Sequence, residues 1–351
     1  MKKLFVLLAA VAFVVVFTAP TFAAEWSFYG SARIHTFWVD SDLGDSVLRT
    51  GDDDDLDLVH ILQGNSRIGA NVKVTDNLTG RFEYGSGPNL RILWGEYDFG
   101  GFKLGVGQHY TPLNFFYSNQ VVFGDTDLLP YGGVYNGRRA MVQGKFGGFK
   151  IALVEPQNNA LEGMTVEDED VVIPLIEAGY SFKIAGLSLD LAGGYQTYSV
   201  EDINDNDEDI NSYIVAIGGT YNMGPFYFGA NYWMGRNVGN MNMWNDGFSE
   251  AVWNDADEDL LDTDGYGFIL VGAFTLSDML RFEAGYGYSL FDTDDADEKD
   301  DTSSYYVQAT ITFAKGVFIV PEIGKIDYGD DPFGDDEGDD TYYGLKWQIN
   351  F

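Results

Sequence analysis

The last ten residues, 342–351, constrain the possible fold more than any other segment. Large apolar side chains alternate there with polar or small ones, and the apolar set is Phe351, Ile349, Trp347, Leu345 and Tyr343. Alternation with a period of two predicts a strand that has one apolar face. A soluble protein rarely exposes such a strand, whereas a membrane barrel turns the apolar face to lipid and the other face to its lumen. The segment therefore predicts a membrane-spanning strand.

The N-terminal segment has the features of an export signal. Two lysines precede an apolar run over residues 4–17, and the small residues Thr21 and Ala23 occupy the positions that a signal peptidase recognises. The run is short for a spanning helix, which needs about 20 residues. We therefore expect a signal peptide over residues 1–23 and a single barrel domain over residues 24–351.

Composition excludes several classes of function. The chain has no cysteine, which removes disulfides, thiol catalysis and thiolate metal sites. The formal net charge is −35, and removal of the two signal lysines makes it −37. Such a charge argues against nucleic acid as a partner, because phosphate binding depends on clustered Lys and Arg. We expect no cofactor, no metal centre and no nucleic-acid partner.

Tight turns and long acidic loops alternate along the mature chain. Seven turns are expected, at Asp76-Asn77, Gly100-Gly101, Gly147-Gly148, Ala185-Gly186, residues 222–225, residues 276–278 and residues 314–316. Eight loops are expected, near residues 40–57, 86–89, 111–137, 156–173, 201–211, 237–264, 292–302 and 329–340. Together they join about sixteen strands, including a second strand over about residues 59–74.

The predicted fold class is all-β, an antiparallel transmembrane β-barrel. An even strand number with both termini on the short-turn side is typical of such barrels. The first strand should pair with the last, because an open sheet edge is not tolerated in hydrocarbon. A soluble β-sandwich or β-helix would show similar alternation, but the terminal Phe351 and the aromatic outer faces favour the barrel.

Three stretches resemble the Gram-negative general porins, which are trimeric and sixteen-stranded. They are residues 26–33 (WSFYGSAR), residues 104–112 (LGVGQHYTP) and the C-terminal strand that ends in Phe351. The resemblance implies a passive water-filled channel, a homotrimer, and contact with outer-membrane lipid and lipopolysaccharide. It also implies that the outer-membrane assembly machinery recognises Phe351, Ile349 and Trp347. The implied location is the outer membrane of a Gram-negative bacterium.

The chain departs from the family's usual pattern before the third loop. It has Gly107-Gln108-His109 where the family often has Gly-Arg-Gln, which removes a basic pore residue. The third loop itself, residues 111–137, has an unusually apolar middle followed by Asp125 and Asp127. We expect this loop to fold into the pore with both carboxylates facing the opening. An extracellular loop used in trimer contacts, or a lid, is the alternative.

Strand parity predicts a basic wall in the lumen. Arg33, Arg67, Arg81 and Arg139 fall on the lumen face, where a charge avoids a cost of about 2–4 kcal/mol at the membrane midplane. Opposite the acidic loop residues, this wall would produce a transverse field across the pore. Salt bridges that merely fill the lumen are the alternative. The resulting expectation is mild cation selectivity at low salt, because the acidic outer vestibule concentrates cations.

The acidic runs in the long loops have two interpretations. They form a solvated acidic surface, or they bind divalent cations weakly and bridge to lipopolysaccharide phosphates. None has the spacing of an EF-hand.

Enzymatic activity is not expected. The three histidines are His35, His60 and His109, and no Gly-x-Ser-x-Gly motif accompanies them. His60 has lipid-facing parity, which favours a place near the membrane interface. The more serious rivals are a channel specific for a sugar or phosphate and, less so, an envelope adhesin.

Overall fold

The computed structural model describes residues 24–45, 56–87, 89–157, 166–202, 207–254, 259–296 and 298–351. The expected signal peptide over residues 1–23 and the acidic run at residues 52–55 lie outside the described residues. Parts of the other acidic loops, at residues 203–206 and 255–258, lie outside them as well. No helix in the described ranges is long and apolar enough to cross a membrane.

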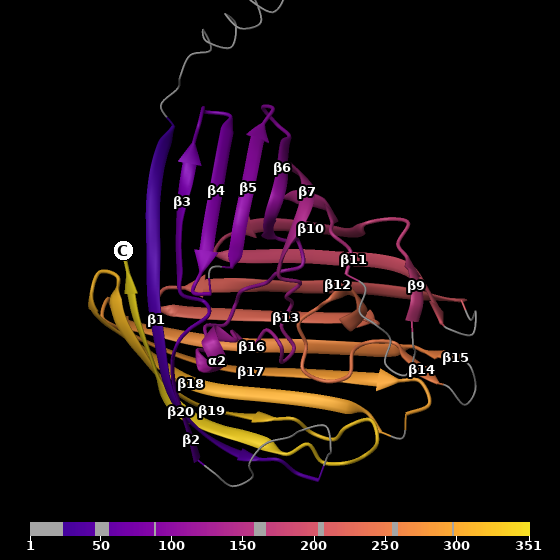
Figure 1. Ribbon diagram of the computed structural model, residues 1–351. Coiled ribbons are helices and arrows are strands. Elements are labelled where there is room, and N and C mark those ends of the chain that lie inside the picture. Colours follow the sequence, from indigo (N-terminus) through magenta and orange to yellow (C-terminus); the bar gives the residue numbers. More distant parts are fainter. Residues whose placement is uncertain are drawn as a thin grey trace, which may run out of the picture.

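Antiparallel strands make up most of the described chain (Figure 1). The strands are β1 (Glu25–Asp42), β2 (Leu56–Leu62), β3 (Arg67–Lys73), β4 (Leu78–Gly85), β5 (Leu90–Asp98), β6 (Lys103–Tyr110), β7 (Arg138–Phe146), β8 (Phe149–Val154), β9 (Val166–Asp170), β10 (Leu175–Ile184), β11 (Leu187–Asp202), β12 (Asp207–Met223), β13 (Phe226–Arg236), β14 (Val252–Asn254), β15 (Asp259–Leu261), β16 (Thr263–Ser277), β17 (Leu280–Thr293), β18 (Asp300–Ala314), β19 (Val317–Asp327) and β20 (Asp339–Asn350). Two short helical turns, α2 (Val122–Asp125) and η1 (Gly239–Met241), lie in loops.

These elements form a closed barrel of sixteen strands, as predicted. Eighteen of them make one sheet, and β14 pairs only with β15 in a small loop hairpin. Both β2 and β3 pair with β1, and both β9 and β10 pair with β11, so each of these pairs is one barrel strand in two pieces. The seven predicted tight turns each lie between consecutive strands.

The second barrel strand differs from the continuous strand that we predicted. It is interrupted between β2 and β3, where Gln63 N–H donates to the Arg33 carbonyl (2.9 Å) and Arg33 N–H donates to Ser66 Oγ (3.0 Å). The resulting turn displaces Gly64 and Asn65 into the lumen, where both line its main cavity. Alternation alone does not reveal this interruption, because Leu62 and Ile68 on either side keep the same outward parity.

The barrel closes by pairing β1 with β20. Their register runs from Ser31 opposite Asn350 to Asp42 opposite Asp339. Beyond it, Gly30 and Phe351 exchange two backbone hydrogen bonds, of 2.7 Å and 3.0 Å. Among the described residues, closure leaves the barrel sheet without an open edge, which satisfies the main requirement for β-structure in a bilayer.

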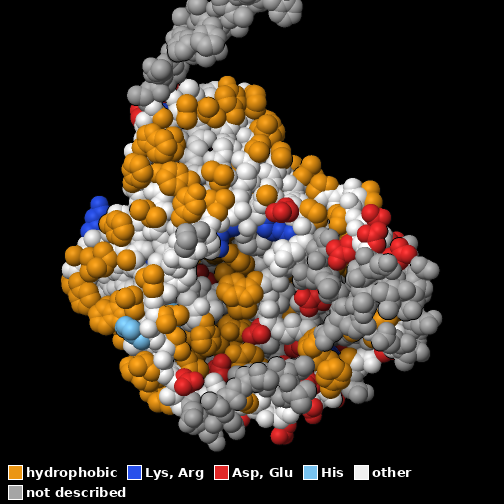
Figure 2. Space-filling view, in the orientation of Figure 1, with side chains coloured by type: hydrophobic (Ala, Val, Ile, Leu, Met, Phe, Trp, Pro, Cys, Tyr) orange, Lys and Arg blue, Asp and Glu red, His pale blue; other side chains and the backbone are white. Residues whose placement is uncertain are grey.

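The outer and inner faces of the barrel differ as the alternation predicts. Hydrophobic side chains cover much of the outer surface, and acidic side chains gather toward the end where β9, β14 and β15 lie (Figures 1 and 2). Phe351, Ile349 and Trp347 are all exposed on the outer face. Lys and Arg side chains are visible within the central hollow of Figure 2. The barrel therefore presents an apolar belt outside and a charged lumen inside.

We predict that Gly30→Val impairs barrel closure. A Cβ at Gly30 would lie 2.5 Å from the Phe351 ring, so the terminal ring would have to move away from the closing strand pair. Overpacking of this kind costs about 1–3 kcal/mol. The expected result is a lower refolding yield, measured by the unheated gel migration of the folded form. Gly95→Val is the matched control, because a Cβ there meets nothing within 4 Å; equal yields for both variants would contradict the prediction.

Candidate functional site

A long loop crosses the lumen between β6 and β7. This constriction loop (residues 111–137) contacts strands on the far side of the barrel, as predicted for the third loop. Ser118 Oγ lies 2.8 Å from the hydroxyl of Tyr306 on β18, and Gln120 Nε2 donates to the hydroxyl of Tyr342 on β20 (2.9 Å). The loop therefore lies inside the barrel and narrows it.

Three buried glutamates fix the path of the constriction loop. Glu177 on β10, Glu283 on β17 and Glu322 on β19 all accept hydrogen bonds from loop backbone N–H groups. The donors are Leu113 (2.9 Å to Glu177), Asn119 (2.9 Å to Glu283), Val121 (2.9 Å to Glu322) and Val122 (3.0 Å to Glu322). A backbone N–H group inside the lumen needs such an acceptor, because a buried donor without a partner costs free energy. The three glutamates attach the loop at three points around the barrel wall.

The tip of the loop has an unusual backbone. Phe123, Asp125, Asp127 and Leu128 have φ values of 48°, 68°, 55° and 57°, in the left-handed region that non-glycine residues seldom adopt. Such residues persist only where surrounding contacts hold them. The backbone there aims both aspartates at the barrel wall and the cavity.

Asp125 is bound to the barrel wall. Its side chain is 5% exposed and forms ion pairs with Arg33 on β1 (2.5 Å) and Lys346 on β20 (2.9 Å), while Asn65 donates to it at 2.9 Å. Burial opposes the charged form, but the positive charges of Lys346 and Arg33 prevail and lower the pKa of Asp125 below its usual value. Asp125 therefore acts as a charged anchor that neutralises part of the basic wall.

Asp127 differs from Asp125 in its partners and in the direction of its pKa shift. It lines the lumen cavity, and none of the described residues forms an ion pair or side-chain hydrogen bond with its carboxylate. Burial in the loop, together with the nearby charge of Asp125, raises the pKa of Asp127 well above its usual value.

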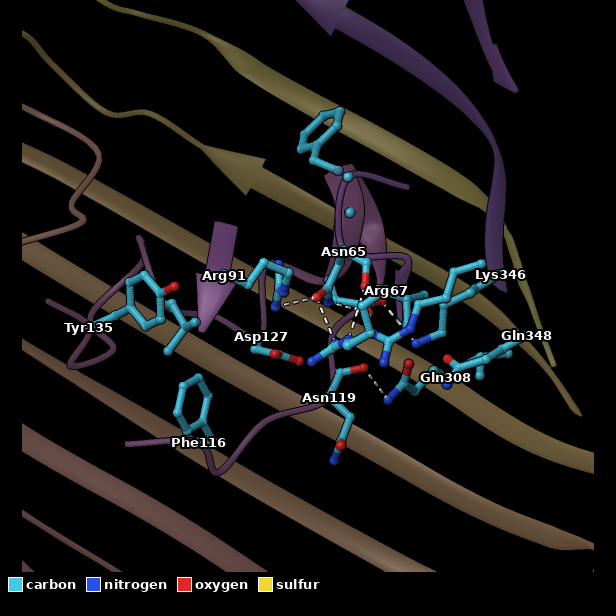
Figure 3. A pocket seen from close by; sticks show the side chains of 18 of the residues that line it. Asn65, Arg67, Arg91, Phe116, Asn119, Asp127, Tyr135, Gln308, Lys346 and Gln348 are labelled. Atoms are coloured by element: carbon cyan, nitrogen blue, oxygen red, sulfur yellow. Dashed lines mark hydrogen bonds and ion pairs between the residues drawn. The ribbon is translucent and has the colours of Figure 1, made fainter. Parts of the chain in front are cut away.

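Basic side chains form a row along the wall opposite the loop tip. Lys346 on β20, Arg33 on β1, Arg67 on β3, Arg91 on β5 and Arg138 on β7 all line one cavity of about 770 Å³. Figure 3 shows Arg91, Arg67 and Lys346 along one side of this cavity, with Asp127 and Asn119 beside them. With Arg281 on β17, six cationic side chains and only two acidic ones, Asp125 and Asp127, line the described cavity.

Ion pairs and hydrogen bonds join members of the row to one another behind the cavity. Glu83 on β4 is fully buried and pairs with Arg91 (2.7 Å) and Arg81 (3.0 Å), and its distance to Arg67 is 3.6 Å. Asn65 accepts from Arg67 (2.6 Å) and from Arg91 (3.0 Å). One carboxylate thus compensates three guanidinium groups, and the surface that faces the cavity stays positive.

Two of the four predicted wall residues lie elsewhere. Arg33 and Arg67 line the cavity, but Arg81 lies in a neighbouring pocket beside Glu96 and Lys145. Arg139 is buried behind the constriction loop, where its guanidinium donates to the carbonyls of Met241 (3.0 Å) and Glu155. Parity assigns Arg139 to the inner face correctly but does not show that loop backbone already surrounds it.

Four cavity residues were absent from the predicted wall. Arg281 and Lys346 share parity with inward Glu283 and Gln348, so the alternation contains their signal. Arg91 follows a register shift between β4 and β5, and Arg138 is the first residue of β7, directly after the loop. Parity is not informative at bulges and strand ends, which is why those two arginines could not be assigned.

The sequence matches the family described as Gram-negative porin over residues 9–331. A search of curated proteins found no match. Among solved structures, the chain resembles the outer membrane channel DcaP of Acinetobacter baumannii, with 17% identity, a TM-score of 0.71, and coverage of 93% of this chain and 97% of that one. It also resembles the trimer form of OmpT of Vibrio cholerae (18%, 0.60, 94% and 100%) and the anion-selective porin from Comamonas acidovorans (12%, 0.58, 93% and 100%). At these identities the structural likeness shows the fold.

We predict that Glu322→Gln loosens the constriction loop. A neutral amide retains one oxygen for the two N–H groups of Val121 and Val122, and a buried N–H group left unsatisfied costs about 1–3 kcal/mol. The expected result is more frequent current fluctuations in single-channel recordings. Glu96→Gln serves as the control, because Glu96 pairs with Lys145 (2.7 Å). The prediction fails if both variants are as quiet as the unmodified channel.

Proposed function

This chain belongs to the Gram-negative porin family, and we propose on that premise that its channel is governed by two opposed electric fields. The barrel is a passive channel of the outer membrane for small hydrophilic solutes. An acidic outer vestibule attracts cations, and a positive constriction favours anions. The observation that carries the proposal is the cavity beside the constriction loop, lined by six cations and two carboxylates.

The constriction has a net positive charge because its two aspartates contribute little free negative charge. Asp125 forms ion pairs with Arg33 and Lys346, so its negative charge is largely neutralised by those two cations. The raised pKa of Asp127 reduces the remaining negative charge. Arg138 has no carboxylate partner among the described residues. An anion in transit therefore meets donors that are not all occupied.

Salt separates the two fields. The Debye length is about 10 Å at 0.1 M and about 3 Å at 1 M, so the diffuse field of the loops fades first. At the constriction a solute is within contact distance of the arginines, where screening is weaker. The mild cation preference expected from the loop charge should accordingly shrink or reverse as salt rises.

We predict cation preference in dilute KCl that shrinks, or reverses to anion preference, toward molar salt. Reversal potentials across a KCl gradient would measure it. Arg67→Gln and Arg33→Gln should shift selectivity toward cations, and Asp125→Asn should shift it toward anions. Arg236→Gln, at the outer end of β13 and paired with Asp262 and Asp264 (both 2.7 Å), is the matched control for loss of a guanidinium outside the cavity. Anion preference already present in dilute salt would rule out the vestibule field.

We predict that anion permeability rises as pH falls through the raised pKa of Asp127. Because the pKa of Asp127 is raised, its carboxylate gains a proton in this direction and the constriction loses a negative charge. Asp127→Asn should remove that part of the pH dependence. Equal pH profiles in the variant and the unmodified channel would assign the change to the outer loops instead.

We propose a homotrimer, with lipid and lipopolysaccharide around the outer face. The support is family membership and the likeness to a structure described as a trimer form. The exposed Phe351, Ile349 and Trp347 are suitably placed for recognition by the assembly machinery. Native mass spectrometry in detergent would test the oligomer, and a monomer mass would contradict it.

No catalytic role is proposed. His60 lies on the outer face and its Nδ1 is 2.8 Å from the Thr36 hydroxyl, while His35 is buried in the wall. Family membership points to transport as the function.

A further inference from the structure

Four aromatic rings gather at one end of the cavity. Tyr110 ends β6, Phe116 and Tyr135 come from the two arms of the constriction loop, and Trp244 comes from the loop before β14. Ring centroids are 5.1 Å apart for Tyr110 and Phe116, 5.9 Å for Phe116 and Tyr135, and 5.6 Å for Tyr135 and Trp244, all edge-to-face. We call these four residues the aromatic cluster; Figure 3 shows Phe116 and Tyr135 side by side at the edge of the cavity.

The cluster exposes apolar surface inside the pore. Phe116 is 46% exposed and Trp244 is 41% exposed, although Leu113 and Val134 of the same loop are completely buried. Exposed apolar area is unfavourable by about 25 cal/mol per Å². The position of Trp244 is fixed, because its backbone N–H donates to the Tyr135 carbonyl (3.0 Å). A backbone contact thus holds Trp244 beside Tyr135, and both Phe116 and Trp244 keep exposed surface in the cavity.

A guanidinium with free donors adjoins the cluster. Arg138 is the cross-strand partner of Tyr110, donates to its hydroxyl (3.0 Å), and has its Cζ 5.2 Å from the ring centroid. The other five cationic residues of the cavity are each within 4 Å of a carboxylate: Arg33, Arg67, Arg91, Arg281 and Lys346. Arg138 has no such partner in the described part of the chain. Its remaining N–H groups can bind an incoming anion in the paired geometry that guanidinium and carboxylate favour.

We propose that the aromatic cluster and Arg138 form a binding subsite for solutes that carry a carboxylate on an aromatic ring. The carboxylate pairs with Arg138, and the solute ring packs edge-to-face against Phe116 and Trp244. A small anion such as acetate gains only the first contact, a neutral aromatic gains only the second, and an aromatic cation is repelled by the basic row. The inference rests on the proposed channel function and specifies the solute class that its constriction favours.

The test is block of single-channel current by sodium benzoate, compared with sodium acetate and benzyl alcohol. An aromatic contact contributes about 0.5–1.5 kcal/mol beyond area burial, and 1.4 kcal/mol is tenfold in affinity. Benzoate should therefore interrupt the current at concentrations about tenfold or more below acetate, with benzyl alcohol weaker than benzoate. Arg138→Gln should reduce the benzoate block to the level of benzyl alcohol, because only the ring contact remains, and Trp244→Ala should bring benzoate closer to acetate. Phe116→Leu should weaken the benzoate block while leaving the acetate response unchanged.

Controls separate this inference from the channel itself. Arg236→Gln removes a guanidinium outside the cavity and should keep the preference for benzoate. Arg138→Lys keeps the positive charge but removes the planar guanidinium, which can donate two parallel hydrogen bonds, and should give an intermediate block. An open channel that responds equally to benzoate and acetate, or a benzoate block that both Arg138→Gln and Trp244→Ala leave unchanged, would overturn the subsite and leave the channel intact. A folded protein without conductance would instead overturn the channel function.

Discussion

The site depends on the bonds between three buried glutamates and the backbone of the constriction loop. The backbone N–H groups of a loop inside a barrel need hydrogen-bond acceptors in the lumen. Glu177, Glu283 and Glu322, which lie on three separate strands, accept hydrogen bonds from four N–H groups of the loop. This attachment brings Asp125 to Arg33 and Lys346. It also positions Phe116 and Tyr135 at the end of the cavity where Tyr110 and Arg138 lie. Without it, the barrel would be a wider tube with no defined cavity between loop and wall.

Some charged side chains of the lumen form ion pairs that hold the structure together, and others face the cavity, where passing ions meet them. Glu83 forms ion pairs with arginines of the wall, and Asp125 forms an ion pair between the loop and Lys346. Both carboxylates therefore stabilise the structure. Arg138 lacks a carboxylate partner among the described residues, so its charge faces the cavity, and the raised pKa of Asp127 reduces the negative charge beside it. An ion that passes therefore responds to a small part of the total charge, and composition alone does not give the sign of selectivity.

The strands were predictable and the cavity was only partly so. Alternation and turn residues determine the sixteen strands, because each strand must bury one face in lipid and expose the other to the lumen. Parity identified Arg33 and Arg67, but Arg91 follows a register shift and Arg138 stands at a strand start. The contribution of Trp244 comes from a fold of a distant loop onto Tyr135, for which the sequence carries no periodic signal.

Chemical modification of Asp127→Cys tests most directly whether the constriction loop lies in the pore. The chain has no cysteine, so a thiol reagent would react at that position alone. Attachment of a negatively charged sulfonate reagent should lower single-channel conductance and shift selectivity toward cations, and a positively charged reagent of similar size should lower conductance and shift selectivity toward anions. Unchanged conductance and selectivity after complete labelling would place the loop tip outside the ion path and contradict the account.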